Sequence, residues 1–372
     1  MEMSALLKLM VGKKASDLFI TAGMPPALKV DGKIAPVVEG QLSPNQAREL
    51  VYSVMTEHQR EDFEHSHECN FAISEPGLGR FRVSAFYQRN HIGMVLRRIE
   101  TEIPTLDSLR MPAIIKSLAM VKRGLVIFVG GTGTGKSTTL AAMIGYRNHN
   151  SNGHIVTLED PIEFVHQHGG CIITQREVGL DTASYDIGLK NTLRQAPDVI
   201  LIGEIRTRET MDYAIAFAET GHLCLATLHA NNANQALDRI INFFPEDRRH
   251  QLLMDLSLNL KAIVAQQLLP RVDGNGRRAA VEVLINTPLA AEHIRIGEIH
   301  KLKDLMKRSS QQGMITFDMA LFELYKAGEI SYDDAIHHAD SANEVRLMIK
   351  LDEEDPSKLA DALAGVSLED VR

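Results

Sequence analysis

The pattern of hydrophobic and polar positions changes near residue 100. Before that point, short segments such as Asp17–Ile20, Arg80–Gln88 and Gly93–Ile99 alternate apolar and polar residues. Alternation with a period of two is typical of strands that bury one face. The pair Asp31-Gly32, which follows one such segment, predicts a tight hairpin turn. We therefore predict a small N-terminal α/β domain with an antiparallel sheet over residues 1–100.

A different pattern follows residue 112, where continuous apolar runs alternate with helical segments. Such runs are typical of parallel strands buried on both faces, so we predict a mostly parallel sheet with helices on both sides over residues 113–285. The runs lie at 125–129, 154–158, 199–202 and 223–228. Residues 101–112 hold two prolines and little periodicity, which predicts a linker. Helical spacing over 286–350 predicts a C-terminal helical subdomain. Residues 351–372 begin with a run of acidic residues, which predicts a mobile acidic tail.

Composition narrows the class of protein only modestly. The 372 residues are 44% hydrophobic and 24% charged, as in ordinary globular proteins. The formal net charge of −8 argues against a nucleic-acid partner. No apolar run is long enough to span a bilayer, and the N-terminus lacks the features of a signal peptide. Three scattered cysteines predict neither a zinc site nor disulfides, so we expect a cytoplasmic protein.

The most specific motif is G-x-x-x-x-G-K-[ST] at residues 130–137, which lies between an apolar run and a helix-forming segment. Its glycines allow the backbone to wrap around a polyphosphate, and the following helix directs its N-terminal N–H groups at the phosphates. We expect Lys136 to bind the β- and γ-phosphates and Ser137 to bind Mg²⁺. The predicted nucleotide-binding residues are Gly130, Gly131, Thr132, Gly133, Thr134, Gly135, Lys136, Ser137 and Thr138.

Acidic residues follow two of the predicted strands. The run 155–158 leads into Glu159, Asp160 and Glu163, and the run 199–202 leads into Gly203 and Glu204. Ligands of open α/β sheets bind at the carboxyl ends of the strands. A single acid there is more often a strand-end or N-cap residue. Two buried strands that both end in acid, behind a complete phosphate loop, favour a site for nucleotide and Mg²⁺.

His222 and His229 bracket the apolar run 223–228. Because side chains alternate along a strand, we expect the two histidines to flank it, with His229 at the carboxyl end near the phosphates. A histidine in such a position, taken alone, is more often structural than catalytic.

Together these segments resemble the Walker A, Asp box, Walker B and His box of the type II/type IV secretion and pilus ATPases. Their order and spacing match over the phosphate loop, 159–163, 203–206 and 219–229. The N-terminal segment 16–32 is similar to the pilus retraction branch, and the resemblance covers nearly the whole chain. It implies a PAS-like N-terminal domain, a RecA-like P-loop domain and a hexameric ring that hydrolyses ATP with Mg²⁺.

The resemblance also implies roles for individual residues. Glu163 would activate water, Glu204 would hold the Mg²⁺ shell, and His222 and His229 would sense the γ-phosphate and the neighbouring subunit. Arginine fingers would come from the region 80–98, although each arginine could equally be solvated or lie at a sheet edge. The candidates are Arg80, Arg82, Arg97 and Arg98. A finger of this kind stabilises charge on the transferred phosphoryl group.

One departure from the retraction branch lies after Asn286-Thr287-Pro288. The branch carries Ala-Ile-Arg-Asn-Leu-Ile-Arg there, whereas Leu289–Arg295 keeps only the final Ile-Arg. This resembles the accessory member of the branch, which implies as partners a paralogous retraction ATPase and the inner-membrane pilus platform protein, and a peripheral position at the inner membrane. The alternatives are a pilus assembly or type II secretion ATPase, which usually has extra N-terminal domains and a four-cysteine motif, and a weakly active regulatory ring subunit. A nucleic-acid translocase is the most distant alternative.

Overall fold

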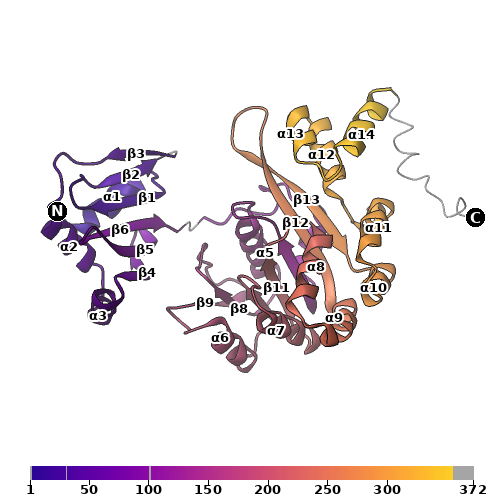
Figure 1. The fold of residues 1–372 in the computed structure, drawn as a ribbon, viewed down its shortest axis with the longest axis horizontal. Helices are drawn as coiled ribbons and strands as arrows, with labels where there is room; N and C mark the ends of the chain where they lie inside the picture. The colour runs from indigo at the N-terminus through magenta and orange to yellow at the C-terminus, as the bar shows by residue number, and fades with distance from the viewer. Residues whose placement is uncertain (1, 31, 100–101, 355–372) are drawn as a thin grey trace, which may run out of the picture. The chain divides into compact units, whose positions relative to one another are not determined.

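The computed structural model describes residues 2–30, 32–99 and 102–354, and it divides into two units (Figure 1). One unit holds the chain up to Glu102 together with Ile162–Val165, and the other holds Ile103–Pro161 and the chain from His166 onwards. One cluster of buried hydrophobic side chains lies in the first unit and two lie in the second. Each unit therefore has its own core, as expected for a chain of this length.

The N-terminal unit is built on a six-stranded antiparallel sheet with the order β3-β2-β1-β6-β5-β4. The predicted hairpin is confirmed, because Val30 pairs with Lys33, although Asp31 lies outside the described residues. Ser43 caps α2 through a capping box with Gln46. The elements are α1 (Met3–Gly12), β1 (Asp17–Thr21), β2 (Ala27–Val30), β3 (Lys33–Pro36), α2 (Pro44–Tyr52), α3 (Glu57–Ser66), β4 (Glu68–Glu75), β5 (Gly79–Gln88) and β6 (His91–Arg98).

The larger unit contains a seven-stranded sheet with the order β13-β12-β7-β11-β10-β8-β9. All neighbouring strands are parallel except β12 and β13. The mostly parallel sheet that we predict is therefore confirmed, with three strands that the apolar runs did not indicate. The strands are β7 (Gly124–Val129), β8 (Gly153–Glu159), β9 (Cys171–Glu177), β10 (Val199–Ile202), β11 (Leu223–Leu228), β12 (Leu260–Pro270) and β13 (Arg277–Ile285).

Helices cover both faces of this sheet. On one face, side chains of α4 and α5 form a core with alternate residues of the strands. On the other face, α6 to α9 and the C-terminal helices form the larger core. Every residue of β7, β10 and β11 is buried, which explains their continuous apolar sequences. The helices are α4 (Ala113–Ala119), α5 (Lys136–Asn150), α6 (Tyr185–Thr192), α7 (Arg208–Glu219), α8 (Ala233–Phe243) and α9 (Glu246–Asn259).

The region after β13 is helical, as predicted. Thr287 caps α10, and Pro288 occupies its first position, so a helix forms there despite the altered sequence. The last helix continues to Glu354 and thus includes residues 351–354 of the predicted acidic tail, with Lys326 2.6 Å from Asp352. The remaining tail, 355–372, lies outside the described residues. The helices are α10 (Pro288–Arg295), α11 (Leu302–Arg308), α12 (Phe317–Lys326), α13 (Tyr332–His337) and α14 (Ala342–Glu354).

A buried carboxylate joins these C-terminal helices to the sheet. Glu282 on β13 is 2% exposed and accepts hydrogen bonds from the first N–H groups of α8 and α12, those of Ala233 (2.8 Å) and Phe317 (3.4 Å). The positive ends of two helices favour a carboxylate between them. Burial nevertheless dominates, and it raises the pKa of Glu282 to about 7.

None of the described helices is long and apolar enough to cross a bilayer.

Candidate nucleotide-binding site

The phosphate loop joins β7 to α5 at the carboxyl edge of the larger sheet. Gly130 follows the last residue of β7 and has a φ of +151°, and Gly135 caps α5 with a φ of +89°. L-residues with a side chain rarely adopt these backbone angles. A Cβ at Gly130 would also lie 2.5 Å from Thr134 Oγ1. The loop geometry therefore requires glycine at both ends.

Lys136 reaches back across the loop that precedes it. Its Nζ donates to the carbonyl oxygens of Gly130 (2.8 Å) and Gly131 (2.7 Å). The ammonium group is thus held beside the loop backbone, where the first N–H groups of α5 also lie. Ser137 and Thr138 follow in the first turn and are half-buried. The Lys136 ammonium group, the N-terminus of α5 and the curved loop backbone together form a binding site for phosphates.

The predicted acids of β8 and β10 lie side by side at the same edge. The two strands are parallel and pair Leu158 with Ile202, which brings the residues that follow them together. Glu204 is 17% exposed and lies 2.7 Å from Arg206, which is in turn 3.6 Å from Asp160. The structure therefore links the two acidic segments through one arginine.

Glu159 is held by the strands around it. Its Oε1 accepts hydrogen bonds from Thr157 (2.6 Å) and Gln175 (3.2 Å). These contacts fix the orientation of its carboxylate at the end of β8, which is the strand-end role considered above. Both acids are thus held by neighbouring side chains, Glu159 by Thr157 and Gln175 and Glu204 by Arg206 and His229.

A tyrosine that we did not predict lies beside these acids. The hydroxyl of Tyr185, at the start of α6, is buried and has no hydrogen-bond partner among the described residues. Burial, and next the charge of Asp160, raises its pKa. A Cβ on Gly203 would lie 2.8 Å from this hydroxyl, so Gly203 allows the close approach. A buried donor without a partner indicates a place for an additional acceptor oxygen.

The two predicted histidines lie at opposite edges of the sheet. His229 follows β11 at its carboxyl end, and its Nε2 lies 3.0 Å from Glu204 Oε1. His222 precedes β11, and its carbonyl accepts a hydrogen bond from Gly124, the first residue of β7. The strand of six residues separates them by roughly 20 Å. The two histidines therefore flank β11 as expected, and the structure does not bring His222 to the phosphate loop of its own chain.

The other predicted residues belong to the N-terminal unit. Glu163 is exposed and lies in the segment Ile162–Val165 of that unit. Arg80 and Arg82 lie on β5, and Arg97 and Arg98 lie on β6. Arg82 and Arg97 pair directly across the strands and are exposed. Arg97 also donates to the buried Asp17 at 2.8 Å, whereas Arg80 and Arg98 are half-buried.

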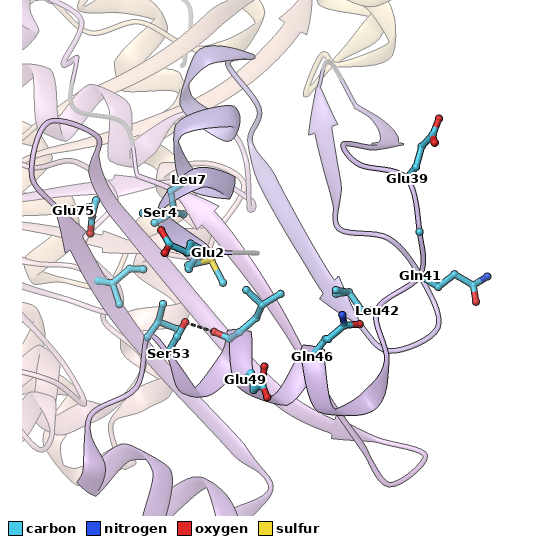
Figure 2. Close-up of a pocket in the computed structure, with 15 residues that line it drawn as sticks. Glu2, Ser4, Leu7, Glu39, Gln41, Leu42, Gln46, Glu49, Ser53 and Glu75 are labelled. Carbon is cyan, nitrogen blue, oxygen red and sulfur yellow. Dashed lines mark hydrogen bonds between the residues drawn. The ribbon is translucent and has the colours of Figure 1, made fainter.

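Two cavities can be compared as nucleotide sites. One of about 560 Å³ lies beside the phosphate loop and is lined by Gly130, Gly131, His229 and residues of α8. The other, of about 710 Å³, lies in the N-terminal unit beside α1, α2 and the end of β4 (Figure 2). Among the described residues that line it are four glutamates and no lysine, arginine or histidine: Glu2, Glu39, Glu49 and Glu75. Carboxylates repel phosphates, so the first cavity is the better candidate.

The residues at the carboxyl edge fit a magnesium–nucleotide complex better than a metal ion alone. Among the described residues, no three acidic, histidine or cysteine side chains converge on a metal site. Mg²⁺ usually keeps several waters and takes only one or two protein ligands together with phosphate oxygens. The Ser137 hydroxyl and the Glu204 carboxylate suit that mode of binding.

Comparisons with known proteins identify the family of this chain. The sequence model of the type II/IV secretion system protein family matches residues 3–320, and the chain belongs to this family. It is a P-loop ATPase, as the motifs predict.

Among its relatives, the type IV pilus ATPase PilU of Pseudomonas aeruginosa is 70% identical over 370 residues, which cover 99% of this chain and 97% of PilU. The type IV pilus retraction ATPase PilT of the same organism is 40% identical over 335 residues, which cover 90% and 97% of the two chains. The crystal structure of the pilus retraction motor PilT with bound ADP has a TM-score of 0.88 and 39% identity, and covers 93% of this chain and 99% of that one. The resemblance to the retraction branch is confirmed, and the identity to PilU is higher than the identity to PilT.

Proposed function

We propose that this chain is an ATP-hydrolysing motor of type IV pilus retraction that acts as a PilU-type accessory to a PilT-type ATPase. The main support is the junction of Glu204 and His229 at the carboxyl edge that also carries the phosphate loop. The full-length similarity to PilU supports the pilus as the system in which this site works.

In this proposal the chain binds ATP through the phosphate loop, with Lys136 leaving the Gly130 and Gly131 carbonyls to contact the β- and γ-phosphates. Ser137 and Glu204 hold Mg²⁺, which supplies neutralisation of charge on the phosphates. His229 contacts Glu204 and also lines the cavity beside the loop, so this contact can report whether a γ-phosphate is present.

Hydrolysis also needs a base and additional positive charge. Glu163 is proposed as the base that orients the attacking water. Arg82 and Arg97 are the most exposed of the four candidate fingers, and the ion pair to Asp17 restrains Arg97. Arg82 is therefore our first choice as the finger. His222, at the opposite edge of the sheet, is proposed to contact a neighbouring subunit of a hexameric ring.

We further propose a cytoplasmic, membrane-peripheral location, with a PilT-type ATPase and the inner-membrane platform protein as partners. The altered helix α10 supports an accessory role. α10 keeps the final Ile-Arg on a helix with a different first half, and Arg295 in that ending pairs with Glu292 at 2.6 Å. Deletion of the gene alone, and together with its PilT-type paralogue, would separate a primary from an accessory motor by the rate of pilus retraction.

ATP turnover by the purified chain tests the enzymatic part. We expect Mg²⁺-dependent release of phosphate that falls by about 100-fold or more in Lys136→Ala, because a charge is lost from the phosphate site. Lys122→Ala is the matched control, since Lys122 is an exposed lysine just before β7 at the opposite edge. Equal turnover in Lys136→Ala and the wild type would contradict the assignment of the phosphate loop as the site of ATP hydrolysis.

A further inference from the structure

A glutamine on β12 lies against the phosphate loop. β12 pairs in parallel with β7, and the last pair joins Ala265 to Val129. β7 then turns into the loop, whereas β12 continues to Pro270. Gln266 is therefore the first residue of β12 that has the loop, rather than a strand, beside it.

Gln266 makes two side-chain hydrogen bonds that span the loop. It is 2% exposed, its Nε2 donates to the carbonyl of Thr134 (2.9 Å), and its Oε1 accepts from the hydroxyl of Thr139 on α5 (2.9 Å). A buried amide is unfavourable unless both of its ends are bonded, and both are bonded here. The side chain thus joins the loop to the helix that follows it.

The two glycines at the ends of the loop leave room for this contact. A Cβ at Gly135 would lie 2.7 Å from Gln266 Nε2, and a Cβ at Gly130 would lie 2.6 Å from the Gln266 carbonyl oxygen. Both glycines therefore allow the loop to lie directly on Gln266. The loop conformation therefore depends on this close approach between the two glycines and Gln266.

The bond to Thr134 also determines the direction of a donor. In a planar trans peptide the C=O of one residue and the N–H of the next point in opposite directions. Because the Thr134 carbonyl points at Gln266, the Gly135 N–H points away from β12. That N–H begins the row of backbone donors that continues into the first turn of α5.

We propose that Gln266 is a positioning residue, which holds the Thr134–Gly135 peptide so that the phosphate loop presents its N–H groups to the polyphosphate. The inference rests on the proposed nucleotide binding at this loop and adds the group that keeps the loop in its binding conformation. Gln266 itself touches loop and helix, and acts on the nucleotide through them.

The test uses the full chain with ATP and ADP as probes, titrated calorimetrically, together with the dependence of turnover on ATP concentration. Gln266→Leu removes both bonds, and we expect the Kd for each nucleotide and the KM for ATP to rise about tenfold, with kcat changed by less than threefold. Gln267→Leu is the matched control: it is the next residue on β12, is half-buried and faces the other side of the sheet. We expect its binding constants to equal those of the wild type.

A second variant, Gln266→Glu, tests the same inference if Gln266→Leu does not fold. It keeps the side-chain length and an acceptor for Thr139 but cannot donate to the Thr134 carbonyl, so nucleotide binding should again weaken at least tenfold. A thermal unfolding midpoint close to that of Gln267→Leu would show that the effect lies in the loop.

The inference is overturned if folded Gln266→Leu or Gln266→Glu binds ATP within twofold of the wild type while Lys136→Ala does not bind it. If the wild type itself binds neither ATP nor ADP, the proposed function fails instead. The two failures are therefore distinguishable.

Discussion

The two edges of the seven-stranded sheet differ in how their polar groups are satisfied. At the amino edge, Asp198 accepts a hydrogen bond from the N–H of His154 at 2.8 Å, and His222 contacts Thr220 at 3.0 Å. At the carboxyl edge, Glu204 holds His229 and Arg206, yet the nearby Tyr185 hydroxyl is buried without a partner among the described residues. At the amino edge the amide oxygens of Gln195 and Asn286 are also buried without a partner among the described residues, but these atoms only accept hydrogen bonds. The Tyr185 hydroxyl at the carboxyl edge can donate, so it is the unpartnered group that suits a phosphate oxygen.

The largest expected difference between the edges concerns turnover. Glu204→Gln should lower kcat by about 100-fold, because it removes the charge that would hold the Mg²⁺ shell. Glu219→Gln is the control, since Glu219 is an exposed acid at the end of α7 that is bonded to Asn259 at 3.3 Å. Steady-state hydrolysis compares them. Equal losses in both variants would contradict the assignment of Glu204.

His229 and His222 allow the two edges of the sheet to be compared within one motif. His229→Ala should lower kcat by about tenfold, because it removes the partner 3.0 Å from Glu204. His222→Ala should leave the ATP dissociation constant within twofold of the wild type, since a six-residue strand separates it from the loop. Calorimetric titration and hydrolysis assays measure both. A weaker ATP affinity in His222→Ala would show that the two edges are coupled, either within one chain or through a contact between subunits.

A third expectation concerns Glu282, which pairs with Ala265 at the level where β7 ends. Its pKa is raised to about 7 by burial, so the folded state favours the protonated carboxyl. The stability that this proton provides is present below the ordinary pKa of 4.5 and is lost as the pH rises through about 7. Between pH 4.5 and 8 the loss should be on the order of 3 kcal/mol.

Glu282→Gln removes this titration, so its free energy of unfolding should change less than that of the wild type over the same range. Urea unfolding at pH 5 and pH 8 measures the difference, and Glu246→Gln, an exposed acid on α9, should titrate like the wild type. Identical pH dependence in Glu282→Gln and the wild type would contradict the raised pKa.

The smallest expected effect tests the unpartnered hydroxyl directly. Tyr185→Phe removes a buried donor that has no described partner, so it should stabilise the nucleotide-free chain by up to about 1 kcal/mol. Tyr332→Phe, at an exposed position, should leave the free energy of unfolding unchanged. If Tyr185→Phe proves clearly destabilising, the hydroxyl already has a partner in solution and the contrast between the edges is weaker.

Local sequence was sufficient to predict the phosphate loop, the acid-ending strands β8 and β10 and the helical C-terminal region. These features depend on apolar runs and short motifs that need no knowledge of distant contacts. The motifs alone do not say which acidic residues lie next to one another. That depends on the order of the strands, and in particular on the pairing of β8 with β10. The position of Glu204 beside His229 follows from that pairing.

Features that depend on long-range contacts were not predicted. β12 and β13 form a hairpin whose inner strand lies next to β7 only after folding, so the role of Gln266 was not visible in its own segment. The signal available was the pair Gln266-Gln267 within the otherwise apolar segment 262–269. Tyr185 was missed because its surroundings come from the ends of β8 and β10. The position of His222 at the opposite end of β11, by contrast, agrees with the expectation that the two histidines flank that strand.

The placement of Glu282 has a consequence for shortening the chain. One carboxylate satisfies the first N–H of α8, beside the phosphate loop, and the first N–H of α12, in the helical region. A chain that ends before Thr316 would keep every residue of the loop and of the acidic edge. It would also expose the largest core and leave half of the acceptor capacity of Glu282 without its donor. The C-terminal helices therefore help to support the fold around the nucleotide site. We expect a chain shortened to the segments that carry the motifs to lose stability.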